Sequence, residues 1–175
     1  RRLTIMSLIV ETGTASATSE SYASVAYADA HFEAIGNPLW STLLTIEKEQ
    51  ALRRAAMFMC QTFRMQWKGY RVSSVQALDW PRYDVDVPDL GVSNIIMPDT
   101  VPDIVLKANV ELAILAAAGE LNPNKTQGIL SKQIGPIKVV YDVASPQGKQ
   151  YTSINDLLRP LLQSVGGMNF KLRRV

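Results

Sequence analysis

The chain has one cysteine, Cys60, and one histidine, His31, among its 175 residues. A single cysteine cannot form an internal disulfide, and two soft or imidazole ligands cannot complete a zinc site. The phosphate-binding patterns GxGxxG and GxxxxGK followed by Ser or Thr do not occur in the sequence. Cys60 is surrounded by Met57, Met59 and Phe63, which predicts a small, buried apolar side chain. The sequence therefore offers no zinc site and no nucleotide-binding loop.

Candidate catalytic groups are equally scarce. A catalytic site requires a nucleophile with a base, a pair of carboxylates or a metal cluster. His31 lies inside a helical pattern with no motif beside it, so a structural role is expected. Asp84, Asp86 and Asp89 form a loose acidic group, but Pro88 breaks the spacing that a calcium loop requires. We expect a protein without enzymatic activity, bound metal or cofactor.

Charge and hydropathy also narrow the functional classes. The longest apolar run, residues 104–119, contains Lys107 and Glu111, so no membrane-spanning helix is predicted. The formal net charge is only +2, well below the concentrated positive charge of most nucleic-acid-binding domains. The apolar patch after Arg1 and Arg2 is too short for a signal peptide. Met6 is the expected natural start, with residues 1–5 an upstream extension, and a cytoplasmic protein is expected.

Helical periodicity predicts two helices in the first third of the chain. Ser24 is the expected N-cap of a short amphipathic helix that ends at Gly36. Thr45 is the expected N-cap of a longer helix that extends to Arg64. The predicted buried positions are Val25, Ala28, Phe32 and Ile35 in the first helix, and Leu52, Ala55, Ala56, Met59 and Phe63 in the second.

Two further helices are predicted after residue 100. Pro102 suits the first turn of a helix that extends to Ala118 and packs against the 46–64 helix. Its predicted buried residues are Ile104, Val105, Ala108, Leu112, Leu115 and Ala116. Ser153 is the expected N-cap of a last helix, residues 154–165, which Pro160 bends or restarts.

Residues 65–100 show no period longer than a few residues. Aromatic side chains are mixed there with glycine and proline, and such long irregular stretches are commonly functional. The 64–71 segment combines Trp67 and Tyr70 with basic residues, as single-strand-binding surfaces do. The alternative is a helix end whose aromatic side chains fill the core, and the low net charge favours it.

The last part of the chain alternates between apolar and polar residues. Ile137, Val139 and Tyr141 share one face of a predicted strand, and residues 146–149 form a turn, so we expect a β-hairpin within residues 129–152. After Gly166 and Gly167, the tail alternates as an unpaired strand would. The predicted fold class is mainly α. We expect a single domain, residues 1–165, made of a bundle of about four helices with a long irregular loop (65–100) and a short β-hairpin. An extended C-terminal tail, residues 166–175, follows it.

Three segments carry a resemblance to a known family. They are residues 6–14 with 20–30, residues 78–82 (Leu-Asp-Trp-Pro-Arg), and residues 154–162 with 166–167 and 172–175. Their order and spacing resemble a family of tailed-phage proteins that are often labelled DnaT-like single-stranded-DNA-binding proteins. Members are encoded among head-assembly genes and resemble head–tail connector adaptors. The extension before Met6 departs from the family pattern.

The resemblance implies a head-completion subunit of the virion, assembled in the host cytoplasm. It implies a homo-oligomeric ring, typically of twelve copies, that docks on the portal protein. The ring would extend the channel for genomic double-stranded DNA and carry the stopper or tail-completion protein. The tail is then the portal-docking element, through Met168, Phe170, Lys171, Leu172, Arg173, Arg174 and Val175. The long loop is the expected contact with the neighbouring subunit, through Trp67, Tyr70, Trp80, Pro81, Arg82 and Tyr83. The alternative is a replication accessory protein that binds single-stranded DNA.

Overall fold

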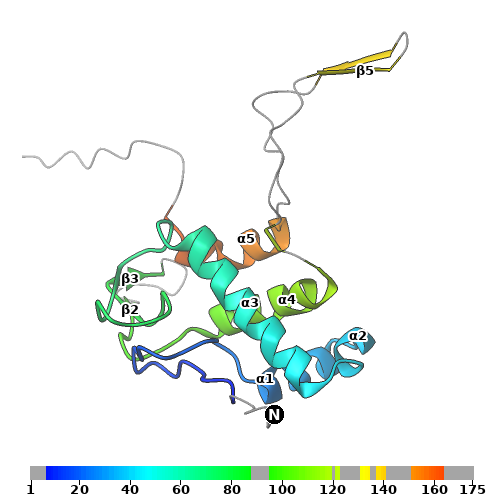
Figure 1. Cartoon of the computed structure of the whole chain (residues 1–175). Coiled ribbons are helices and arrows are strands. Elements are labelled where there is room, and N and C mark those ends of the chain that lie inside the picture. The colour runs from blue at the N-terminus through cyan, green and yellow to red at the C-terminus, as the bar shows by residue number, and fades with distance from the viewer. Residues whose placement is uncertain are drawn as a thin grey trace, which may run out of the picture.

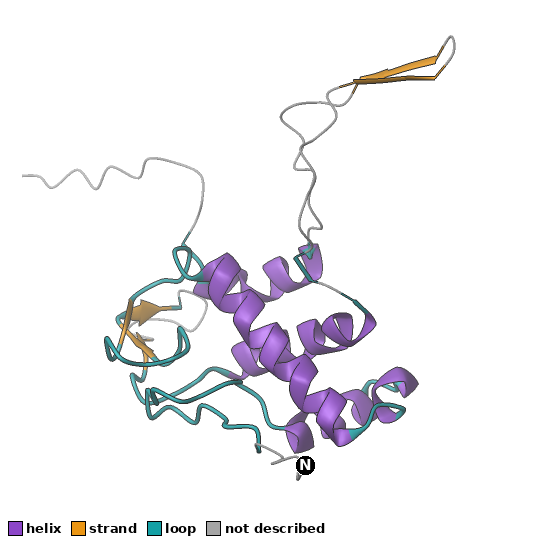
Figure 2. Cartoon of the chain, viewed as in Figure 1, coloured by secondary structure: helices purple, strands orange, loops and turns teal. Residues whose placement is uncertain are grey.

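The computed structural model describes residues 7–87, 95–119, 121–122, 131–134, 137–140 and 151–163. Helices form the body of the described chain, and the short strands within residues 70–96 lie at one side of it (Figures 1 and 2). The helices are α1 (Val25–Ala34), α2 (Pro38–Ser41), α3 (Thr45–Phe63), α4 (Asp103–Ala118) and α5 (Thr152–Leu158), with one 3-10 turn, η2 (Arg159–Leu161). The strands are β1 (Tyr70–Arg71), β2 (Arg82–Tyr83), β3 (Val85–Asp86), β4 (Ile95–Ile96), β5 (Ser131–Ile134) and β6 (Ile137–Val140). The prediction of a mainly α fold is confirmed.

The core is built on the packing of α3 against α4. All five residues predicted for the buried face of the α3 helix are buried, as are Val105, Ala108, Leu112 and Ala116 of α4. Alanines on both helices keep the packing close, because small side chains let helix axes approach. Leu115 was predicted to be buried, but it is 41% exposed. It lies beside the buried stripe of α4, which follows the 105, 108, 112 and 116 spacing.

One buried polar side chain joins the N-terminal segment to both central helices. Asn109, fully buried on α4, accepts hydrogen bonds at Oδ1 from the Ser21 hydroxyl (2.8 Å) and the Ala23 amide (3.2 Å). Its Nδ2 donates to the Leu52 carbonyl of α3 (3.3 Å). Without these partners the buried Asn109 amide itself would be unpaired, at a cost of roughly 1–3 kcal/mol. Asn109 therefore fixes where the chain before α1 crosses the helix pair.

The helix starts agree with the sequence to within one residue. Ser24 caps α1, as predicted, and its hydroxyl accepts from the Tyr27 amide at 3.1 Å. Thr45 was predicted to be a cap but is the first residue of α3, and the Glu47 carboxylate accepts from the Leu44 amide instead (2.8 Å). Ile35 was predicted to be buried but is 55% exposed, because α1 ends one residue earlier.

The later helices show the same small shifts. Pro102 is the N-cap of α4, one position before the predicted one, and α5 begins at Thr152 and not after Ser153. The last helix was predicted to reach residue 165 with a bend or restart at Pro160; instead α5 ends at Leu158 and the chain continues through Pro160 as the 3-10 turn η2, which ends at Leu161. A proline removes the amide that the next α-helical hydrogen bond would need.

The irregular segment after α3 contains more regular structure than was predicted. Antiparallel pairing joins β1 to β2 and β3 to β4. Strands of two residues cannot show an alternating pattern, which is why the sequence reads as a loop. The pair β5–β6 confirms a hairpin within residues 129–152, but its strands are joined between Ile134 and Ile137 and not through the predicted turn. The predicted turn at 146–149 and the tail at 166–175 lie outside the described residues.

Gly69, between α3 and β1, is expected to be intolerant of a side chain. Its φ is +63°, and an added Cβ would collide with the backbone carbonyls of Tyr83 and Asp84. Gly36 has a φ of +71°, but a Cβ there would meet no atom within 4 Å. Gly36→Ala therefore carries only the backbone strain, about 1 kcal/mol, and serves as the matched control. We expect Gly69→Ala to lower the free energy of unfolding, measured by chemical denaturation, by roughly 3 kcal/mol. Equal losses in the two variants would contradict the close approach of these carbonyls to Gly69.

Candidate nucleic-acid interface

The segment that follows α3 is organised around one buried carboxylate. Asp79 is fully buried, and its side chain accepts hydrogen bonds from Arg64 Nε (2.8 Å) and Trp67 Nε1 (3.3 Å). Its backbone amide donates to the Tyr22 hydroxyl at 2.9 Å. Burial raises the pKa of Tyr22 well above its usual value, so this hydroxyl stays neutral. Asp79 thereby ties the end of α3, the N-terminal segment and the loop before β2 into one unit.

The two tryptophans of this segment belong to the core. Trp67 is 1% exposed and Trp80 is fully buried, and their rings meet edge to face with centroids 5.7 Å apart. Edge-to-face packing is a favoured arrangement of aromatic rings. Pro81, which follows Trp80 through a cis peptide bond, is also buried. Trp67, Trp80 and Pro81 were predicted to contact a neighbouring subunit, which would require them to lie on the surface. The structure buries all three. For the same reason, Trp67 is inaccessible to a DNA base.

Arg82 is also directed inward. Its guanidinium donates to three backbone carbonyls, those of Lys68 (2.8 Å), Gly69 (2.7 Å) and Asp79 (3.2 Å). Burial lowers its pKa from the ordinary arginine value. A buried cation of this kind is stabilised by its hydrogen bonds and is not free for a partner. The predicted surface role of Arg82 is therefore wrong, and its role is to hold the turn before β1 against the turn before β2.

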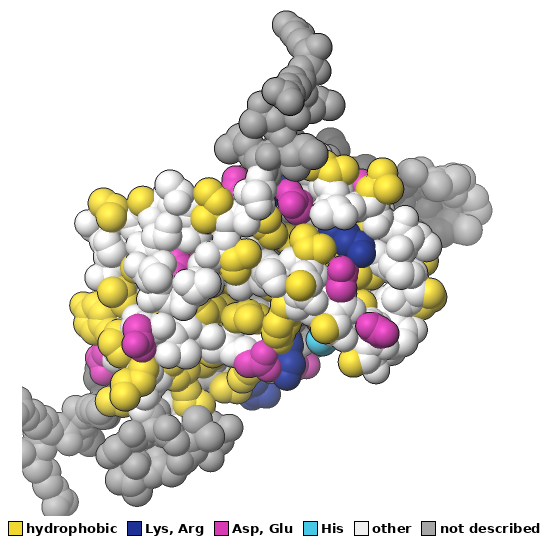
Figure 3. Space-filling view, turned by 90° about the horizontal axis from the view of Figure 1, so that it is seen from below, with side chains coloured by type: hydrophobic (Ala, Val, Ile, Leu, Met, Phe, Trp, Pro, Cys, Tyr) yellow, Lys and Arg dark blue, Asp and Glu magenta, His cyan; other side chains and the backbone are white. Residues whose placement is uncertain are grey.

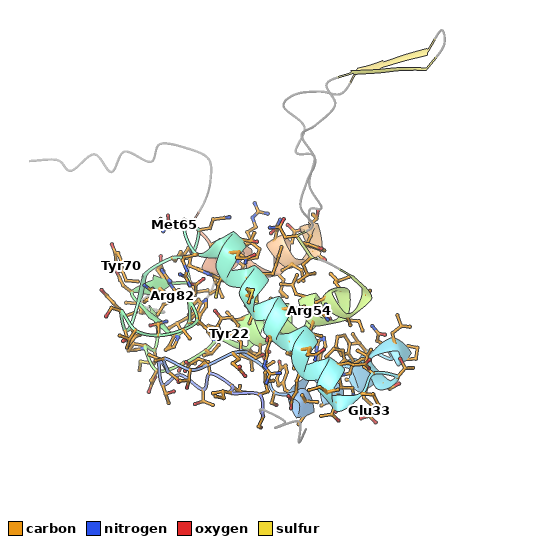
Figure 4. All side chains as sticks on the ribbon, viewed as in Figure 1. Tyr22, Glu33, Arg54, Met65, Tyr70 and Arg82 are labelled. Atoms are coloured by element: carbon orange, nitrogen blue, oxygen red, sulfur yellow. The ribbon has the colours of Figure 1, made fainter. Side chains whose placement is uncertain are left out.

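The two tyrosines of the segment remain accessible. Tyr70 on β1 and Tyr83 on β2 are directly opposite in the antiparallel register. They are 61% and 47% exposed, and their ring centroids are 5.5 Å apart with 32° between the planes. Figure 4 shows Tyr70 at the outer edge of this end, with Arg82 toward the body. We call this pair, with β1 and β2, the tyrosine edge.

Charges of both signs surround the tyrosine edge. Lys68 and Arg71 are half-buried, and their side chains donate to the carbonyls of Asp86 (2.9 Å) and Gln76 (3.5 Å). Asp84 and Asp86 are exposed nearby in sequence. On the face drawn in Figure 3, lysine and arginine form only small groups among acidic and apolar side chains. The edge can offer two aromatic faces and two cations, but it is not a strongly positive groove.

The histidine and the cysteine both have local structural surroundings in the part of the chain that the structure describes. His31 Nε2 lies 2.7 Å from Glu111 Oε1 of α4, a contact that joins α1 to α4. Burial raises the pKa of the Cys60 thiol, which keeps it protonated and unreactive. Within the described ranges, no group of three or more His, Cys, Asp or Glu side chains could hold a metal ion. No helix in that part of the chain is long and apolar enough to cross a membrane.

Comparison with known proteins assigns the family. The model of the family described as "Putative DnaT-like ssDNA binding protein" matches residues 6–175. The chain belongs to this family. Searches of curated proteins and of solved structures found no match. The description of the DnaT-like family names single-stranded DNA, and it does not name a head–tail connector.

Of the candidate residues predicted from the sequence, the structure brings one pair to an accessible site. Tyr70 and Tyr83 are adjacent and exposed, whereas their aromatic neighbours are buried. Sequence reasoning missed the role of Asp79, although its place directly before a Trp-Pro pair in a segment poor in charge was a signal. The tail residues Met168, Phe170, Lys171, Leu172, Arg173, Arg174 and Val175 lie outside the described residues.

Proposed function

We propose that this DnaT-like protein binds single-stranded DNA without sequence specificity, through the tyrosine edge. The observation that carries the proposal is the exposed, adjacent pair of Tyr70 and Tyr83 rings. Exposed aromatic faces are the recurring element of sequence-tolerant single-strand sites, because every base can stack on them. The family description is consistent with this function.

At the tyrosine edge, the aromatic rings contact the bases and the cations contact the phosphates. Unstacked bases lie against the outer faces of Tyr70 and Tyr83, each stack contributing roughly 1–3 kcal/mol. Lys68 and Arg71 are close enough in sequence to meet the phosphates on either side. Asp84 and Asp86 oppose the phosphate charge, so stacking supplies most of the affinity. Double-stranded DNA, whose bases are already stacked, is bound more weakly.

The salt dependence of binding tests this division. Two cations meeting phosphates give a slope of log K against log salt of about −1.4, since each contact on a single strand contributes about −0.7. We expect this slope in fluorescence-anisotropy titrations of a labelled oligothymidine at salt concentrations from about 50 to about 200 mM. A slope steeper than about −4 would place binding on a more basic surface. Absence of saturable binding at micromolar protein would remove the proposed function.

A second proposal is the head–tail connector subunit, which the resemblance of the sequence implies. The observation that favours it is the large apolar side chains left exposed on several elements, as an assembling subunit would leave them. They include Met57 on α3, Met65 after it, Met97 after β4 and Leu115 on α4. Removal of residues 168–175 is then expected to leave the fold intact and to abolish co-purification with the portal protein. Retained co-purification would contradict docking by the tail.

A further inference from the structure

The turn that follows α3 lies beside η2, the last regular element that the structure describes. The Lys68 amide donates to the Leu161 carbonyl of η2 at 3.0 Å, and Trp67 forms an antiparallel bridge with Leu162. Residues far apart in the sequence therefore share one surface, which continues directly into β1 and the tyrosine edge. We call residues 64–68, together with η2, the basic turn.

Positive charge collects on the basic turn. It contains Arg64, Lys68 and Arg159 and no aspartate or glutamate. The Arg64 side chain is 46% exposed, although its Nε is hydrogen-bonded to a buried carboxylate. The exposed guanidinium of Arg159 makes no hydrogen bond or ion pair with the described residues. Two exposed acids lie nearby, Asp156 three residues before Arg159 and Asp86, whose carbonyl accepts from Lys68. The charge is mixed, but cations outnumber acids.

An apolar side chain projects from the middle of the basic turn. Met65 is 87% exposed, more than any other large apolar side chain among the described residues. Figure 4 shows Met65 and Tyr70 at the same end of the molecule, and the five peptide steps between them span at most about 18 Å. A thioether packs favourably on aromatic rings, and every base presents such a face. Met65 flanked by cations therefore suits a nucleotide better than it suits bulk water.

We propose that the single strand bound at the tyrosine edge continues across the basic turn, with a base packed on Met65 and phosphates on Arg64 and Arg159. The proposal rests on the proposed function and defines its substrate as a strand long enough to cover both surfaces. Lys68 belongs to both, so the cations form a continuous path. Charge complementarity and continuity with the tyrosine edge favour the same strand as the occupant of the basic turn.

The salt dependence of binding separates the two surfaces. Each phosphate contact on a single strand contributes about −0.7 to the slope of log K against log salt. The slope of about −1.4 given by Lys68 and Arg71 then applies to an oligothymidine of about 4 nucleotides, which covers the tyrosine edge alone. One of about 16 nucleotides also meets Arg64 and Arg159, so we expect a slope of about −2.8. A longer strand offers more registers, which raises its affinity but leaves the slope unchanged.

The double variant Met65→Ala, Arg159→Ala in the full-length protein tests the contacts themselves. Both side chains are exposed, whereas Arg64 is left in place because it also pairs with Asp79. We expect the variant to bind the longer oligothymidine at least about tenfold more weakly, because hydrogen bonds to charged groups are among the stronger ones. Its slope is expected to fall to about −2.1, through the loss of one cation. Its affinity for the shorter oligothymidine is expected to stay at the wild-type value.

Met57→Ala with Arg54→Ala is the matched control, because it makes the same two changes at exposed positions of α3. It is expected to bind both oligonucleotides as the wild type does, and circular dichroism checks that all variants fold. Equal wild-type slopes for the two lengths would overturn the path across the basic turn and leave the tyrosine edge in place. Wild-type affinity of the Met65, Arg159 variant for the longer strand, or an equal loss in the control, has the same consequence. A wild-type protein that binds neither oligonucleotide would instead remove the proposed function, and this proposal with it.

Discussion

Replacing Asp79 by alanine is expected to lower the free energy of unfolding by about 3 kcal/mol. The carboxylate is fully buried and accepts from both Arg64 and Trp67. Its loss leaves the buried indole N–H of Trp67 without an acceptor, which costs roughly 1–3 kcal/mol. It also opens a void beside the packed tryptophans. Arg64 contributes less to the loss, because its side chain is 46% exposed and stays hydrated.

Urea denaturation followed by tryptophan fluorescence measures this change directly. Asp79→Asn keeps one acceptor for Trp67 and is expected to lose about half as much. Asp86→Ala is the matched control, because Asp86 is an exposed aspartate of the same region, and it is expected to change stability by less than about 0.5 kcal/mol. If Asp79→Ala were as stable as Asp86→Ala, Asp79 would not organise this segment.

The Tyr70→Ala, Tyr83→Ala double variant is expected to bind single-stranded DNA at least about 30-fold more weakly than the wild type. Two lost stacking partners at about 1 kcal/mol each give this factor. Both side chains are about half exposed or more, so their removal leaves the core intact. Phenylalanine at both positions keeps the aromatic faces and is expected to retain most of the affinity.

Anisotropy titrations with a labelled oligothymidine provide the affinities. Val75→Ala is the control for loss of an exposed apolar side chain near this segment, since Val75 is 67% exposed, and it is expected to bind as the wild type does. Equal affinity of the double alanine variant and the wild type would exclude the tyrosine edge. A loss in the double phenylalanine variant as large as that in the alanine variant would assign binding to the hydroxyls and not to the rings.

The helical core could be predicted from the sequence because its signals are local. The apolar spacing of α3 from Leu52 to Phe63 repeats over three turns, and this face is buried as predicted. The errors lie at element ends. Ile35 and Leu115 fit the helical period, but one follows the last residue of α1 and the other lies beside the stripe that α3 covers. A period identifies a face and cannot identify how much of it a neighbour will cover.

The candidate site was less predictable, because side-chain direction in the segment after α3 depends on tertiary contacts. Trp67, Trp80 and Arg82 have the composition of a binding loop, yet all three are buried. Trp67 donates to Asp79, Arg82 donates to backbone carbonyls, and Trp80 packs edge to face against Trp67. The basic and aromatic composition of the 64–71 segment draws attention to Tyr70, but nothing in the sequence pairs it with Tyr83. They become an exposed pair only because β1 and β2 align them directly opposite each other. Strand register between two-residue strands cannot be read from residue spacing.

The central claim is that single-stranded DNA lies on Tyr70 and Tyr83. Ultraviolet photocrosslinking of the full-length protein to a bromodeoxyuridine-substituted single-stranded oligonucleotide, followed by peptide mass spectrometry, tests it most directly. We predict saturable crosslinks on Tyr70 or Tyr83 that unlabelled single-stranded DNA competes away more effectively than duplex DNA does. No saturable crosslink, or crosslinks confined to the basic residues near the C-terminus, would contradict the assignment of this edge as the DNA-binding site.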